Sequence, residues 1–292
     1  MFEFDRDKFD NFVNLTFEEI LESFEQNPDI SDDKNYWFFD NENQEILFIS
    51  YVDPSKFSDI KLIHKEDELL IEQNKISLAL KASLYIGYLM FEQGFPLLIL
   101  NANSNNTNKK SFSNYDNKIA LDIFIDDNPD FDLEETKLII FLFNEGRDYY
   151  TTTVQLPSKY RSIMKELKLK EELLDIPDLD YLSEQYRIPS INLAIGFYDF
   201  GKATERINYL DLEDCIKVAY SITELLEPVD KENLQIEITE IDEDEEDFEE
   251  EESFNHIEED EYDEDEEDEE EDDEDYDDDE YDEDYDDEDE DY

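Results

Sequence analysis

The sequence predicts an α+β protein with a mainly antiparallel sheet, packed helices and a disordered acidic C-terminal tail. Helical spacing of apolar residues recurs in several segments, while apolar, β-branched runs follow one another across short turns. The last 53 residues, 240–292, contain 41 Asp or Glu and no Lys or Arg. We therefore predict a folded body over residues 1–239, with an alternative sub-boundary near residue 157, and a polyacidic tail over residues 240–292.

The N-terminal quarter predicts one helix followed by two hairpins. Residues 5–26 carry phenylalanines and aliphatic residues at spacings of three and four, which is typical of an amphipathic helix. Residues 36–39 and 46–52 are aromatic and β-branched on both sides of a turn-rich segment, which predicts a hairpin. Residues 60–64 and 69–73 predict a second hairpin.

The next segment predicts a buried helix and two strands. Residues 75–93 are apolar on nearly every face, so we expect a helix that lies against the sheet and ends at Gly94. Residues 97–100 and 119–125 predict strands, and alternation of apolar and polar residues in the second favours a strand with one wet face. Residues 101–117, rich in Asn and Ser, predict a flexible excursion.

The most regular strand pattern comes after this excursion. Residues 138–143 are six consecutive apolar residues, which predict a central strand buried on both faces. A turn at 144–146 leads into residues 149–156, whose threonines favour a strand, so we predict a hairpin. After Pro157, residues 159–174 predict a helix.

The remainder of the body predicts a strand at 191–197, a helix from Asp211 to Leu226, and an edge strand over residues 234–238. Residues 82–100 form the most apolar stretch, but Glu92, Gln93, Gly94 and Pro96 interrupt it. A charge at the centre of a membrane span costs about 2.5–3.5 kcal/mol. We therefore interpret this stretch as a helix followed by a strand.

The tail cannot form a core. Ordering a residue costs roughly 1–2 kcal/mol of backbone entropy, and the tail has few apolar residues to bury. Low hydrophobicity with high net charge is the signature of disorder. Sparse apolar residues in an acidic chain are candidate contacts for a basic, partly apolar groove. In the tail these are Phe248, Phe254, Ile257, Tyr276, Tyr281 and Tyr285.

A cluster of basic residues follows Pro157. It consists of Lys159, Arg161, Lys165, Lys168 and Lys170. One interpretation is a solvated helix face with acidic neighbours. The other is a docking face, either for a partner's acidic residues or for the tail of this protein.

Catalytic signals are weak throughout the sequence. The chain has two histidines, His64 at a predicted strand end and His256 in the tail, and one cysteine, Cys215, beside acidic residues that oppose a thiolate. Asp122 and Asp126 on a predicted strand, followed by an acid-x-Lys motif ending at Lys137, superficially match metal-dependent nucleases. With 89 acidic residues in the chain, such a match arises easily. No phosphate loop or zinc-ligand spacing is present, so we expect no cofactor and no metal.

These observations predict a non-enzymatic regulatory protein. Its polyanionic tail would engage a basic, nucleic-acid-binding partner by mimicking nucleic acid, since the tail approaches the charge density of one DNA strand. The second hypothesis is an α+β binding domain whose tail serves only solubility, and the third is a nuclease-like enzyme. A single cysteine and an N-terminus without a secretory signal predict a cytoplasmic location, or a nuclear one in a eukaryote. We expect no membrane association and no direct binding of nucleic acid.

Overall fold

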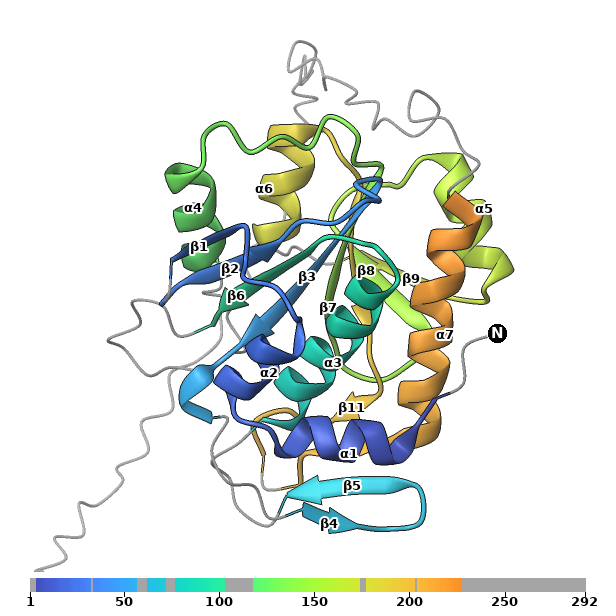
Figure 1. The fold of residues 1–292 in the computed structure, drawn as a ribbon. Helices are drawn as coiled ribbons and strands as arrows, with labels where there is room; N and C mark the ends of the chain where they lie inside the picture. The colour runs from blue at the N-terminus through green and yellow to red at the C-terminus, as the bar shows by residue number, and fades with distance from the viewer. Residues whose placement is uncertain are drawn as a thin grey trace, which may run out of the picture. The chain divides into compact units, whose positions relative to one another are not determined.

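A computed structural model describes the protein over seven ranges of its body. These ranges are 4–32, 34–56, 62–71, 77–102, 118–173, 177–202 and 204–226. All of them lie within the first of the two units of the chain, Met1–Thr239. Figure 1 shows their path. The predicted tail and the predicted strand at 234–238 lie outside the described residues. Of the predicted excursion over residues 101–117, only residues 101 and 102 are described.

Among the described residues, the large sheet has eight strands in a mixed arrangement. From one edge to the other they are β1 (Ile30–Asp32), β2 (Tyr36–Phe39), β6 (Leu97–Asn101), β3 (Ile46–Val52), β7 (Leu138–Asn144), β10 (Ser190–Ala194), β8 (Tyr149–Thr152) and β9 (Lys170–Leu173). The four central strands β6, β3, β7 and β10 run parallel. Strands β1, β2 and β8 pair antiparallel with their inner neighbours, and β9 runs parallel to β8.

A small antiparallel sheet accompanies the large one. Its order is β11 (Phe197–Tyr198), β12 (Arg206–Asn208), β5 (Glu68–Ile71) and β4 (Leu62–His64). The predicted hairpin of residues 60–64 and 69–73 is confirmed, because β4 and β5 pair antiparallel with His64 opposite Leu69.

Seven α-helices are found in the described residues. They are α1 (Arg6–Asn14), α2 (Phe17–Ser23), α3 (Leu78–Glu92), α4 (Lys118–Asp127), α5 (Ser158–Glu166), α6 (Pro177–Tyr186) and α7 (Tyr209–Leu226), with a 3₁₀ turn at Pro54–Lys56. None of the described helices is long and apolar enough to span a membrane. The α+β class predicted from the sequence is confirmed.

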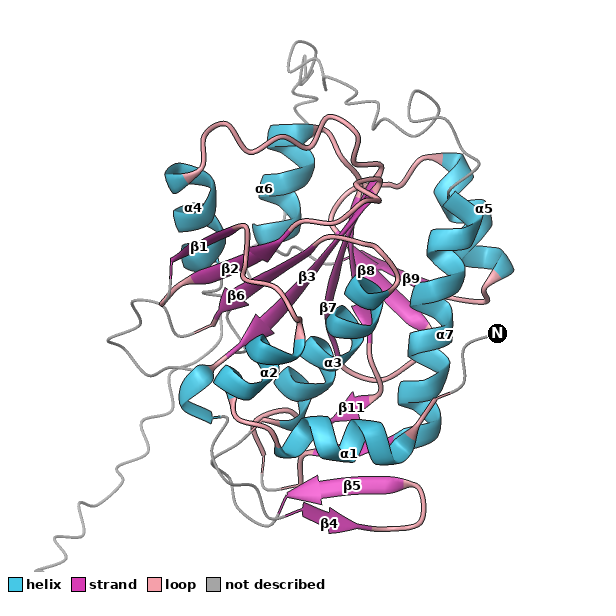
Figure 2. Ribbon diagram, viewed as in Figure 1, coloured by secondary structure: helices cyan, strands magenta, loops and turns pink. Residues whose placement is uncertain are grey.

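The helices cover both faces of the large sheet (Figure 2). Side chains of successive strand residues point to opposite faces, and β2 shows this directly. The Trp37 ring meets Phe17 of α2 at 4.7 Å, whereas the Tyr36 ring meets Phe124 of α4 at 5.1 Å. Because helices cover both faces, the central strands are buried throughout, which explains the unbroken apolar run of β7.

The predicted N-terminal helix of residues 5–26 is wrong as a single element. The chain forms α1 and α2 with a break at Leu15 and Thr16. Thr16 starts α2 with a capping box, in which its hydroxyl accepts from the Glu19 amide and the Glu19 carboxylate accepts from the Thr16 amide. This reciprocal pair begins a new helix in a new direction.

Two predicted hairpins are also wrong, although their strands are correct. Strand β6 lies between β2 and β3, and β10 lies between β7 and β8. In each case a strand from later in the sequence inserts between two consecutive strands. The short turns therefore connect strands that are not neighbours in the sheet.

Residues 119–125 form part of helix α4 rather than the predicted strand. Leu121 and Phe124 are both 1 % exposed, and Ile125 is half-buried against the same core. Their i, i+3 and i+4 spacing is helical. The predicted helix at 159–174 is too long, since α5 ends at Glu166 and residues 170–173 form β9.

Candidate functional site

A cavity in the described residues lies beside α4. Its volume is about 450 Å³, within the range of about 300–1,000 Å³ that is typical of small-molecule sites. It is formed by β1, β2, the turn before β3, the start of β3 and the loop from α4 to β7. Its lining residues are Ile30, Phe38, Asp40, Gln44, Leu47, Pro96, Asp127, Asn128, Pro129, Asp130, Phe131, Asp132, Leu133 and Thr136.

Apolar side chains form about half of the cavity wall. The Phe38 and Phe131 rings meet edge to face with centroids 5.0 Å apart, and Phe131 also packs on Phe124 of α4 at 4.8 Å. Leu47 contributes from β3 and Leu133 from the following loop. Since these residues belong to the core, the loop from Asn128 to Thr136 is anchored on the sheet rather than projecting from it.

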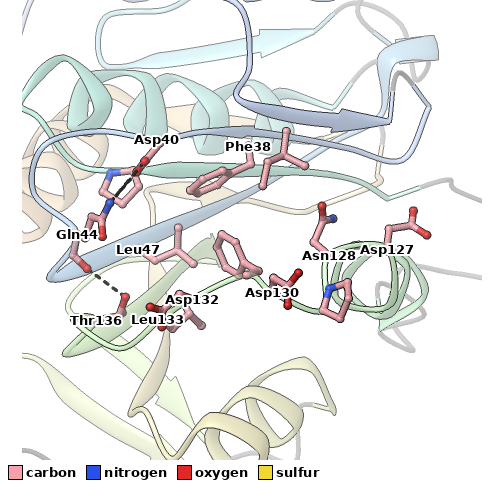
Figure 3. A pocket seen from close by; sticks show the side chains of 14 residues that line it. Phe38, Asp40, Gln44, Leu47, Asp127, Asn128, Asp130, Asp132, Leu133 and Thr136 are labelled. Atoms are coloured by element: carbon pink, nitrogen blue, oxygen red, sulfur yellow. Dashed lines mark hydrogen bonds between the residues drawn. The ribbon is translucent and has the colours of Figure 1, made fainter.

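Carboxylates supply the charge of the cavity. Figure 3 shows Asp40 and Gln44 at one end, Asp127 and Asn128 at the other, and Phe38 and Leu47 between them. Asp130 and Asp132 complete four acidic side chains in the lining, which contains no Lys, Arg or His. Unopposed carboxylates in a concave site with apolar walls create a negative potential that attracts cations.

Hydrogen bonds fix both ends of the cavity. At one end, Gln44 Nε2 donates to the Asp40 carboxylate at 3.3 Å, and Thr136 donates to the Gln44 carbonyl at 3.0 Å. At the other end, the Tyr36 hydroxyl donates to Asp127 at 3.1 Å. Burial, supplemented by this carboxylate, raises the pKa of Tyr36, so the tyrosine stays protonated as the donor.

The cavity lies at the edge of the sheet where β3 and β6 begin. In parallel α/β sheets, ligands ordinarily bind at the opposite edge, where strands end. At that edge Asp53 follows β3, is 1 % exposed and accepts from the Ser55 hydroxyl at 2.6 Å. Residues 57–61 and 103–117, which follow β3 and β6 in the sequence, lie outside the described residues.

The structure places the predicted basic cluster on α5, on the turn after it and at the start of β9. Lys159, Arg161 and Lys165 lie on α5, Lys168 lies in the turn after it, and Lys170 begins β9. All five are exposed. The predicted contacts Phe248, Phe254, Ile257, Tyr276, Tyr281 and Tyr285 lie outside the described residues.

The other chemical candidates take ordinary structural positions. His64 ends β4, as predicted, with Nδ1 3.4 Å from the Asp10 carboxylate. Cys215 is buried in α7, and burial followed by the nearby Asp211 raises the pKa of its thiol. Lys137 is buried and bonds Glu45 at 2.6 Å. Asp126 lies on a helix rather than a strand, so the predicted nuclease-like arrangement is wrong.

Sequence reasoning missed the cavity. Its local signal was the segment 126–132, in which four aspartates surround Asn128, Pro129 and Phe131. Acidic residues are so common in this chain that the segment did not stand out. The other walls come from residues 30–47 and Pro96, which only the fold brings to the same place.

Comparisons with known proteins give matches at the level of structure alone. No family model matches the sequence, and no curated protein matches it. An aminopeptidase PepT from Bacillus cereus covers 75% of this chain and 97% of its own, with 9% identity and a TM-score of 0.48. A tripeptidase from Staphylococcus aureus covers 75% and 97%, with 8% identity and a TM-score of 0.49. An endoglucanase from Thermotoga maritima covers 77% and 95%, with 10% identity and a TM-score of 0.41.

These matches correct the predicted function. The prediction of a non-enzymatic regulatory protein that mimics nucleic acid is contradicted by these comparisons, in which the similar structures include an aminopeptidase and a tripeptidase. Identities of 8–10% and TM-scores below 0.5 carry no activity over to this chain. Among the described residues, no group of three or more His, Cys, Asp or Glu is placed to hold a metal ion.

Proposed function

We propose that the body of this protein binds an organic cation with an apolar portion, such as the amine-bearing end of a peptide, in the cavity beside α4. The proposal rests on the set of residues that line this cavity. Four aspartates surround two edge-to-face phenylalanines, and the lining contains no basic side chain.

Each part of such a ligand has a counterpart in the cavity. An ammonium or guanidinium group is favoured by the negative potential of Asp127, Asp130 and Asp132. An aromatic face adds a cation–π contribution of about 0.5–1 kcal/mol at an exposed site. The apolar portion displaces water from Phe38 and Leu47, and each square ångström of buried apolar area contributes about 25 cal/mol.

Asp130 offers the cleanest substitution for a test. Its side chain is exposed in the lining, and it makes no hydrogen bond or ion pair among the described residues. Asp126 provides the matched control, because it is exposed on α4 four residues earlier and does not line the cavity. A change at either position alters the net charge equally.

The experiment is calorimetric titration of full-length protein with the dipeptide amide Lys-Phe-NH₂ at physiological salt, where the Debye length is about 8 Å. We expect Asp130→Lys to lower the affinity at least tenfold and Asp126→Lys to lower it less than threefold. N-acetyl-Gln-Phe-NH₂, which lacks both amines, should bind at least tenfold more weakly. Mass spectrometry of the same samples shows whether the peptide bond of a tripeptide version is cleaved.

Three outcomes would overturn the proposal. The first is equal affinity for the neutral peptide, and the second is an equal loss in the two variants, which would indicate only a long-range field. The third is displacement of the peptide by millimolar Mg²⁺ or Ca²⁺ with tighter binding of the metal, which would assign the carboxylates to a metal ion. A cytoplasmic location, favoured by the lone cysteine, stays a prediction.

A further inference from the structure

The exposed surface of α5 carries cations that the folded body leaves unused. Tyr160, Ile163 and Met164 face the core and are at most 4 % exposed. The opposite face presents Lys159, Arg161 and Lys165, each exposed. Helical spacing thus separates a buried stripe from a basic one.

The basic surface continues beyond the helix into the large sheet. Lys168 adopts a positive φ of 60°, and its amide donates to the Lys165 carbonyl at 3.0 Å. The chain turns sharply there and enters β9 at Lys170. We call Lys159, Arg161, Lys165, Lys168 and Lys170 the basic surface.

Several basic residues elsewhere in the described body lie beside acidic ones. Lys8 lies 2.9 Å from Glu92, Lys217 lies 2.7 Å from Glu213, and Arg147 lies 2.7 Å from Asp211. Within the described ranges, no residue of the basic surface has an acidic oxygen within 4.0 Å. In a protein with a net charge of −66, these five exposed cations lie within twelve residues of the chain and none of them is paired with an acidic side chain of the described residues.

The neighbouring strand offers an open edge. β9 is the last strand of the large sheet in the described residues, and all four of its residues are exposed. An edge strand presents backbone N–H and C=O groups that can pair with another extended chain. Leu173 at its end is 63 % exposed, the most exposed large apolar side chain of the described body.

We propose that the basic surface and β9 bind an extended acidic segment of a partner polypeptide that carries an apolar residue at one end. The acidic residues meet Lys165, Lys168 and Lys170, and the apolar residue covers Leu173. Glu171 and Glu172 of β9 exclude acidic side chains directly opposite them, so uncharged residues of the segment lie there.

Three properties favour a polypeptide over a nucleic acid. The edge of a sheet forms hydrogen bonds with the N–H and C=O groups of a peptide backbone, and a sugar-phosphate chain has no such groups. The nine-residue helix α5 spans only about 13 Å at 1.5 Å per residue, so it can contact only a short stretch of a nucleic acid. The acidic body also repels a dense polyanion more strongly than a segment with a few carboxylates.

The test uses full-length protein and a fluorescent eight-residue peptide with four glutamates, two serines and two leucines in that order. Lys165→Glu should weaken binding at least fivefold, and the pair Lys159→Glu and Lys165→Glu at least twentyfold. The matched control is Lys34→Glu, because Lys34 is exposed, has no acidic partner among the described residues, and lies beside β1 at the opposite edge of the sheet. It should change affinity less than twofold.

Two further measurements separate the contributions. Raising the salt from 50 to 500 mM should weaken binding about tenfold, since exposed charges are screened. Leu173→Ser should weaken binding several-fold while the dependence on salt stays unchanged. Equal effects of Lys165→Glu and Lys34→Glu, or equal binding of a peptide with Gln in place of Glu, would overturn the proposal. Tighter binding of a six-nucleotide single strand than of the peptide would do so too and would make nucleic acid the occupant.

Discussion

The side-chain nitrogen of Lys81 lies 2.7 Å from the carbonyl oxygen of Val13, and no part of the lysine is exposed. The same nitrogen lies 2.7 Å from the carbonyl of Leu15. Helix α3 therefore binds the two carbonyls at the end of α1, where a helix leaves backbone acceptors unsatisfied.

This arrangement predicts a stability that rises with pH. Burial lowers the pKa of Lys81 from 10.5 to about 7, opposed in part by Glu19. Between these values the unfolded chain binds a proton that the folded protein does not, so the free energy of unfolding increases with pH. Relative to Lys81→Met, wild-type protein should gain at least about 1 kcal/mol from pH 7 to pH 9.5, since one pKa unit corresponds to 1.36 kcal/mol.

Urea unfolding of both proteins at pH 7, 8 and 9.5 measures this difference. The comparison with Lys81→Met cancels the contributions of all other groups that titrate in this range. A difference between the two proteins that stays constant with pH would show that Lys81 remains charged when buried.

Two tyrosines, one buried and one partly buried, predict that the free energy of unfolding falls at alkaline pH. Burial raises the pKa of Tyr160, whose hydroxyl donates to the Lys137 carbonyl, and raises the pKa of Tyr88 to about 12. The unfolded chain loses these protons near pH 10, so stability falls as pH rises above 10. Tyr160→Phe should reduce the slope of this fall by about one proton, whereas Tyr220→Phe on α7 provides a matched aromatic control.

The readout is the free energy of unfolding between pH 9.5 and 11.5, together with phenolate absorbance. Because Tyr160→Phe also leaves a carbonyl without its donor, we expect a loss of about 1–2 kcal/mol at pH 7. The lost hydrogen bond is measured at pH 7, whereas the loss of the tyrosine proton is measured from the slope between pH 9.5 and 11.5. Identical slopes for the wild type and Tyr160→Phe would show that Tyr160 ionises within the folded protein.

The buried position of Glu205 predicts a large loss of stability on substitution. Its carboxylate accepts from the Ala79 amide at 2.9 Å, the Ser77 hydroxyl at 3.0 Å and the Gly201 amide at 2.9 Å. It therefore satisfies the N-terminus of α3, where backbone donors have no partner within the helix. Burial raises the pKa of Glu205 despite these bonds.

We expect Glu205→Ala to lower the free energy of unfolding by about 2–4 kcal/mol, because three donors, two of them buried, lose their acceptor. Glu205→Gln keeps one oxygen and should cost about half as much. Glu224→Ala on the exposed face of α7 should cost less than about 0.5 kcal/mol. A cost for Glu205→Ala as small as that of Glu224→Ala would contradict this role in capping α3. Since the folded pKa is raised, the contribution of Glu205 falls as pH rises through the window above 4.5.

The sequence predicted local structure well where one signal dominated. The apolar run of β7 and the apolar helix α3 were both predicted, and Gly94 ends that helix with a φ of +96°. The prediction of a strand over residues 119–125 was wrong because the isoleucines alternate as in a strand, while Leu121 and Phe124 also fit a helix. Periodicity alone cannot decide between two patterns that the same residues satisfy.

Pairing of strands was not predictable from local patterns. The turn between β2 and β3 looks like a hairpin turn, yet β6 fills the space between them. The insertion depends on contacts between residues some 50–60 positions apart, such as Phe48 opposite Leu97. The cavity beside α4 depends on the same long-range order, because Pro96 and Asp130 meet only when β6 lies beside β3.

Gly87 gives a final prediction, in which helix propensity and packing oppose each other. The glycine lies within α3 where the helix crosses the sheet. A Cβ at this position would lie 2.6 Å from Ser50 Oγ and 2.8 Å from a methyl group of Leu97. Replacing a helical glycine by alanine ordinarily stabilises by about 1 kcal/mol, whereas overpacking a core costs about 1–3 kcal/mol.

Packing should prevail here. Leu97 is fully buried, and Ser50 is held by its bond to the Ser83 carbonyl at 3.0 Å, so neither neighbour has room to retreat. We expect Gly87→Ala to lower the free energy of unfolding by about 1–2 kcal/mol. Ser50→Ala removes the nearer atom, so the double variant should lose less than the sum of the two single variants, by at least about 0.5 kcal/mol. Urea unfolding of the four proteins completes the cycle, and additive losses would show that α3 shifts as a whole rather than pressing on Ser50.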